Sequence, residues 1–73
     1  MLIIQPSGYP AWPYEIPWPH VPGLNSFSLD FRLSLYCQDL LGPENQSWRA
    51  TNSGVHFRNM DDALMIKLGF SLD

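Results

Sequence analysis

The feature that most constrains this fold is a run of prolines near the start of the chain. Residues 6–22 hold six of the seven prolines and four large aromatic residues: Tyr9, Trp12, Tyr14 and Trp18. Each proline fixes its own φ angle, lacks an amide donor and pushes the preceding residue toward extended conformations. The run therefore excludes helix, and we expect an extended arm over residues 6–23 that is partly polyproline II.

Three alternatives remain open for this arm. Its rings fold back as a lid over the domain's own apolar surface, because a small domain is short of core. Alternatively they contact a partner protein, because a stiff chain loses little entropy on binding. The third alternative is a disordered segment. If the arm binds a partner, the expected contact residues are Trp12, Tyr14, Trp18 and His20.

The size and charge of the chain narrow the class of protein. With 73 residues, 45% apolar and 15% charged, we expect one folded domain over residues 1–73. The net charge is −3 and the four basic residues are scattered, which disfavours nucleic-acid binding. The first residues lack the basic region of a signal peptide, and no apolar run reaches the roughly 18 residues of a membrane span. The sequence predicts a soluble, cytoplasmic protein with no membrane association.

Two stretches before residue 42 carry secondary-structure signals. Residues 2–4 are a short apolar run that predicts a first strand. Residues 26–41 are ambiguous, because residues 27–35 alternate as a strand does while the later apolar positions fall at helical spacing. Asn25 as a cap, a staple from Leu24 to Leu29, and the stop at Gly42 favour a helix. On that helix Phe27, Phe31 and Leu35 form an outer apolar stripe, which the arm is expected to cover.

The last third of the chain predicts two more strands and a second helix. Trp48 and Ala50 begin a strand that turns back through residues 51–54, whose Asn and Gly suit a hairpin loop. Val55 and Phe57 then alternate with His56 and Arg58, as in a half-buried strand. Asn59 is placed to cap the next helix with its side chain, followed by the first-turn acids Asp61 and Asp62. The expected core residues in this part of the chain are Phe57, Ala63, Leu64 and Leu68. The predicted fold is α+β, a three-stranded sheet with two helices on one face, similar to a split β-α-β arrangement.

No set of residues predicts catalysis, a cofactor or a metal. Cys37 with His20 or His56 offers a nucleophile and a base, but its neighbours are apolar and a buried structural cysteine is the favoured interpretation. A single cysteine also excludes an internal disulfide, as expected in a reducing compartment. The two histidines and the cysteine lack zinc-ligand spacing. We therefore predict a protein that is not an enzyme.

Residues 56–70 carry a resemblance to a known group of proteins. The segment His-Phe-Arg-Asn-Met-Asp-Asp-Ala-Leu-Met-Ile-Lys-Leu-Gly-Phe resembles the ending of small tailed-bacteriophage proteins, which close with an aromatic strand and an Asp-Ala-x-x-x-Lys-Leu helix. Those proteins commonly have Phe where Ile66 stands. The resemblance implies a phage accessory protein that binds and inhibits or redirects a bacterial host protein, with a defence system as one setting. The alternative is a small virion structural or decoration component. Homo-oligomerisation remains open.

Overall fold

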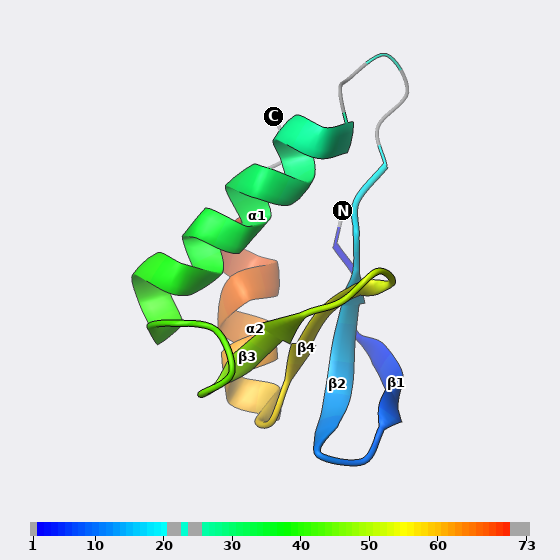
Figure 1. The fold of residues 1–73 in the computed structure, drawn as a ribbon, viewed down its shortest axis with the longest axis vertical. Helices are drawn as coiled ribbons and strands as arrows, with labels where there is room; N and C mark the ends of the chain where they lie inside the picture. The colour runs from blue at the N-terminus through cyan, green and yellow to red at the C-terminus, as the bar shows by residue number, and fades with distance from the viewer. Residues whose placement is uncertain (1, 21–22, 24–25, 71–73) are drawn as a thin grey trace.

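The computed structural model describes residues 2–20, 23 and 26–70 of the chain (Figure 1). Within these residues the elements follow in the order β1 (Gln5–Tyr9), β2 (Trp12–Pro17), α1 (Ser26–Leu41), β3 (Trp48–Ala50), β4 (Gly54–Phe57) and α2 (Met60–Gly69). The strands form one sheet in the order β1-β2-β4-β3, and every neighbouring pair is antiparallel. The α+β class is confirmed, but the sheet has four strands in this part of the chain rather than the predicted three.

The proline-rich segment supplies β2 and most of β1, which were not predicted as strands. Its residues 6–9 and 12–17 are extended as predicted, but they pair as a β1–β2 hairpin instead of standing apart as an arm. Residues 21 and 22 of the predicted arm lie outside the described residues. Prolines are normally excluded from a central strand such as β2, because they cannot donate a ladder hydrogen bond. Here Pro13 lies opposite the irregularity in β1 between Pro6 and Tyr9, and Pro17 lies beyond the last residue that pairs with β1. The missing amides therefore fall where the β1–β2 ladder is interrupted or has ended.

The predicted first strand at residues 2–4 is wrong. β1 begins at Gln5, immediately after this apolar run. Leu2 is nevertheless buried in the core, and Ile4 packs against it, while Ile3 is exposed. The run is used for burial without entering the sheet.

Helix α1 confirms the predicted helix over residues 26–41. Leu29, Leu33 and Cys37, which recur every fourth residue, are buried because they share the inner side of the helix. Gly42 follows with a φ of 89°, a left-handed conformation that glycine adopts without strain, and its amide donates to the Gln38 carbonyl. The predicted cap at Asn25 and staple at Leu24 lie outside the described residues.

Helix α2 is present, but its predicted inner side is partly wrong. Phe57 and Ala63 are buried as predicted, whereas Leu64 is exposed and Leu68 is 80% exposed. Ile66 takes the expected core place, three residues after Ala63. Asn59 has the extended backbone of an N-cap, yet its side chain makes no capping hydrogen bond. The acids Asp61 and Asp62 stand in the first turn as predicted.

One core joins the helices to a single side of the sheet (Figure 1). The residues of this core come from both the helices and the sheet, together with Leu2: Ile16, Leu33, Cys37, Trp48, Val55, Phe57, Ala63 and Ile66. We call the other side, which carries Glu15 and His56, the open face; these residues pair in register and alternate with the core residues of their strands. The candidate sites lie on the open face and beside the outer side of α1.

Candidate functional site

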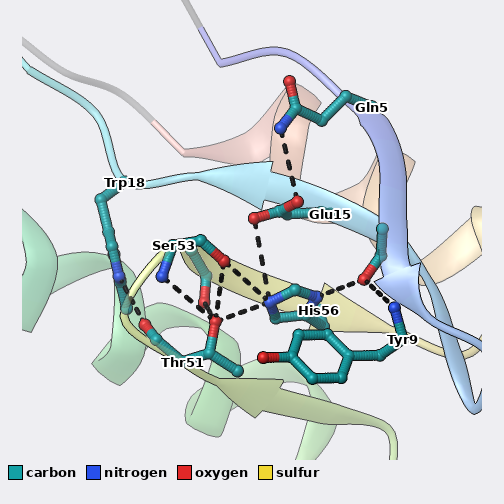
Figure 2. A network of polar contacts seen from close by, with 9 residues as sticks. Gln5, Tyr9, Glu15, Trp18, Thr51, Ser53 and His56 are labelled. Carbon is teal, nitrogen blue, oxygen red and sulfur yellow. Dashed lines mark hydrogen bonds and ion pairs between the residues drawn. The ribbon is translucent and has the colours of Figure 1, made fainter.

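The open face holds a buried imidazole at the centre of a polar network (Figure 2). His56 is only 1% exposed. Its Nδ1 lies 2.8 Å from the Ser7 hydroxyl, and its Nε2 lies 2.7 Å from the Thr51 hydroxyl. Both ring nitrogens therefore have a partner, as a buried polar group requires. The sequence pattern placed His56 on the solvent side of a half-buried strand, and that expectation of exposure is wrong.

A buried carboxylate completes this network. Glu15 Oε2 lies 3.8 Å from His56 Nε2, and Glu15 Oε1 accepts a hydrogen bond of 3.4 Å from the Gln5 side chain. A buried acid without such partners is strongly unfavourable, so both contacts help to keep Glu15 in the sheet. The antiparallel register explains the placement, because Glu15 on β2 is directly opposite His56 on β4.

Local irregularities in the strands bring the hydroxyl groups to the ring. Ser7 lies in the part of β1 where the register with β2 shifts, and its hydroxyl also accepts a hydrogen bond from the Tyr9 amide. Such bulges redirect side chains. Thr51 opens the β3–β4 loop, whose ends are joined by its amide and the Gly54 carbonyl. The Tyr9 ring then covers the imidazole edge-to-face at a centroid distance of 5.1 Å.

This network contains the groups of a nucleophilic site but supports anchoring better. Ser7 and Glu15 contact opposite nitrogens of His56, as a nucleophile and an acid do around a catalytic histidine. However, the pocket of about 50 Å³ beside the ring is lined by Tyr9, Trp12, Arg49, Thr51 and His56, and not by Ser7. The hydroxyl of Ser7 thus does not face that pocket. We assign the network to holding β1 onto the open face.

The predicted contact residues Trp12, Tyr14, Trp18 and His20 do not form one surface. Trp12 is only 7% exposed, and the Arg58 guanidinium lies 4.3 Å from its ring centroid. Tyr14 packs against the core on the helix side. Trp18 is half-buried and donates its indole N–H to the Thr51 carbonyl at 2.7 Å, while His20 is exposed. Their role in partner binding stays a prediction, with Trp18 and His20 the more accessible pair.

Trp18 helps to line a hollow between β2, the β3–β4 loop and the outer side of α1. We call it the Trp18 hollow; it has a volume of about 420 Å³ and includes Asp30, Phe31, Ser34, Thr51 and Asn52 in its lining. Thr51 belongs to both candidate sites, because its hydroxyl contacts His56 and its carbonyl holds Trp18. The polar network therefore positions one wall of the hollow.

Asp30 is a candidate site residue that sequence reasoning missed. Its Oδ1 is buried and has no hydrogen-bond partner among the described residues, and burial raises the pKa of its carboxyl above 3.8. A sequence signal for this exists. Asp30 lies between Leu29 and Phe31, and no basic residue stands three or four positions away on α1.

The structure leaves apolar surface uncovered on the outer stripe of α1, which the arm was expected to cover. Phe31 is 58% exposed and Leu35 is 45% exposed, so the β1–β2 hairpin does not cover them as the lid alternative expected. The structure brings only Trp18 from the proline-rich segment to the edge of this stripe, across the hollow. The lid interpretation is therefore wrong for Phe31 and Leu35.

Cys37 lies in the core and away from the open face. It is fully buried, and burial raises the pKa of its thiol to about 12, which agrees with a structural cysteine. Among the described residues, no group of three or more His, Cys, Asp or Glu side chains is arranged to hold a metal ion. Neither helix in the same residues has the length and apolarity to cross a bilayer.

Comparison with protein-family models, with curated proteins and with solved structures finds no match for this chain.

Proposed function

We propose that this protein works by binding another protein through the outer side of α1 and the adjoining Trp18 hollow. The observation that carries the proposal is the exposure of Phe31 and Leu35 on a small domain that has a concave, partly aromatic site beside them. Contiguous exposed apolar side chains on a small domain typically mark an interaction surface. Aromatic side chains also dominate the energy of protein interfaces.

The proposed partner is a bacterial host protein. This choice follows the resemblance of residues 56–70 to the ends of small tailed-phage proteins, and the proposed effect is to inhibit or redirect that partner. Trp18 keeps the contact role expected for it, now together with Phe31 across the hollow. The surface is built on helix α1 and on Trp18, whose amide and indole N–H are both hydrogen-bonded, so little ordering entropy is lost on binding.

The test is affinity capture from a bacterial lysate, followed by binding to the purified captured protein. The double variant Phe31→Ser/Leu35→Ser removes the apolar stripe and is expected to weaken binding by about 2 kcal/mol or more, the usual hot-spot threshold. The matched control is Met60→Ser, which removes an exposed apolar side chain on α2 that does not line the hollow. Equal binding by the double variant and by the wild type would contradict the proposal.

A virion component is the competing function. Mass spectrometry of purified particles separates the two, because a structural or decoration protein is present at a fixed copy number. A host-binding protein is expected in the infected cell and at no fixed number in particles. Detection at constant stoichiometry would replace the host-binding proposal with the structural one.

A further inference from the structure

Asp30, one oxygen of which is buried without a partner among the described residues, gives the Trp18 hollow a specific chemistry. Asp30 Oδ1 is buried without a hydrogen-bond partner in the described part of the chain. A buried acceptor left without a hydrogen-bond partner destabilises the fold, and more so when it is charged. A buried polar atom without a partner in a native protein calls for an explanation, and a bound ligand is one. The Asp30 side chain as a whole is half-buried and lines the hollow, so a ligand there would lie against its carboxylate.

The surroundings of Asp30 define which donor fits. The Trp18 and Phe31 side chains line the same hollow, and its volume of about 420 Å³ lies within the usual range of roughly 300–1,000 Å³ for ligand sites. Aromatic faces attract cations through their quadrupole, and a carboxylate attracts them through its charge. Asp30 is the only titratable residue in the described lining, so none of the described lining residues is basic.

We propose that the Trp18 hollow binds a basic side chain of the partner protein, with its cationic group on Asp30 and its stem against Trp18 and Phe31. This inference rests on the proposed function and specifies the chemistry of the partner. The net charge of −3 of the whole chain favours the approach of a basic partner surface.

Other occupants fit the hollow less well. An anion would be repelled by the Asp30 carboxylate, and a purely apolar side chain would cover this carboxylate without offering it a hydrogen bond or an opposite charge. A metal ion needs several acidic or imidazole ligands, and Asp30 is the single such residue in the described lining. Arginine is preferred over lysine, because a planar guanidinium both stacks on rings and pairs with a carboxylate.

Peptide titration of the whole, isotope-labelled protein tests this inference without a known partner. The probes are acetyl-Gly-Arg-Gly-amide, its lysine counterpart and the neutral glutamine counterpart, followed by nuclear magnetic resonance at the Trp18 indole N–H. Saturable shifts are expected with the arginine peptide and, more weakly, with the lysine peptide. Equal shifts with the glutamine peptide, or no saturable shift with the basic peptides, would overturn the inference.

Two matched variants assign the effect to one carboxylate. Asp30→Asn keeps the shape and removes the charge, so the affinity for the arginine peptide is expected to fall about tenfold or more. The control is Asp39→Asn, which neutralises another acid on α1 that does not line this hollow. Unchanged affinity in Asp30→Asn, or an equal loss in Asp39→Asn, would sink the proposal. The amide spectrum of each variant shows whether it is folded.

The same variants separate this inference from the proposed function. If a purified host partner binds the wild type and Asp30→Asn equally, the basic side chain is refuted while protein binding stands. If the arginine peptide binds through Asp30 but Phe31→Ser/Leu35→Ser does not weaken the binding of the captured partner, the proposed surface is refuted. In that case the cation site stands.

Discussion

His56 Nδ1 lies 2.8 Å from the hydroxyl of Ser7, although 49 positions separate the two residues in the sequence. Their strands are not neighbours, because β2 lies between β1 and β4. In a flat sheet two strands so placed are about 9.5 Å apart. The two side chains therefore reach toward each other across β2, and Ser7 lies where the register between β1 and β2 is irregular.

Removing the Ser7 hydroxyl tests whether this bond holds β1 in place. Ser7→Ala leaves His56 Nδ1 buried without its partner, so we expect the free energy of unfolding to fall by about 1–3 kcal/mol. Ser28→Ala is the matched control, because Ser28 is exposed on α1 and a change of at most about 0.5 kcal/mol is expected. Urea unfolding measures both. Equal stability of the two variants would show that the network does not hold β1.

The inner side of α2 is tested by two truncations on the same helix. Ile66→Ala removes a fully buried side chain and is expected to cost about 2–5 kcal/mol, because a cavity remains in the core. Leu68→Ala, at an exposed position, is expected to change stability by at most about 0.5 kcal/mol. Thermal melts distinguish them. A larger loss in Leu68→Ala would mean that α2 is rotated relative to this structure.

The thiol of Cys37 is expected to be inert while the protein is folded. Burial raises its pKa to about 12, so at pH 8 only roughly one molecule in 10,000 carries the thiolate. Because the folded pKa lies above the unfolded value of 9.0, this thiol contributes stability that is full below about pH 9 and is lost as the pH rises toward 12. Labelling with a thiol reagent should be slow in buffer and rapid in denaturant. Rapid labelling of folded protein would contradict the burial.

Asp30→Asn should stabilise the fold, and more so at neutral than at acid pH. Burial raises the folded pKa of Asp30 above 3.8, so stability from the protonated acid is full below about pH 3.8 and is lost as the pH rises through the folded pKa. The side-chain amide introduced by Asp30→Asn does not titrate. Thermal melts at about pH 3 and about pH 7 should therefore show a larger difference in melting temperature between the variant and the wild type at pH 7. The same difference in melting temperature at both pH values would mean that burial does not disfavour the ionised form of Asp30.

Gly54 is expected to tolerate no side chain. A Cβ at this position would collide with the carbonyl oxygen of Ile16 and approach the Cα of Pro17 at 2.7 Å, both on the backbone of β2. Gly54→Ala is thus expected to cost about 1–3 kcal/mol by forcing β2 and β4 apart. Gly8→Ala is the control, because nothing lies within 4 Å of a Cβ there. Denaturant unfolding that ranks the two variants equally would contradict the close approach.

Local chemistry in the sequence determined the helices and the β3–β4 hairpin. Helix α1 was predictable because apolar residues recur every fourth position and Gly42 stops the helix, so neighbouring residues decide the conformation. The loop before β4 was predictable because Asn and Gly favour turns, although neither Asn52 nor Gly54 takes the positive φ that was the reason to expect a turn there. These signals need no information about distant residues.

Tertiary structure decided how β1 and β2 join the sheet and where the candidate sites lie. The prolines of β2 argued against a central strand, and only the pairing shows that Pro13 faces the irregular part of β1 and that Pro17 lies past its end. Likewise Leu68 and Ile66 are equally apolar, and the position of the sheet chooses which is buried. Ser7 contacts His56 across 49 positions of the sequence, and the Trp18 hollow brings Asp30 on α1 together with Trp18 and the β3–β4 loop. Contacts over such separations depend on how the elements pack, and packing is a property of the whole chain rather than of any segment.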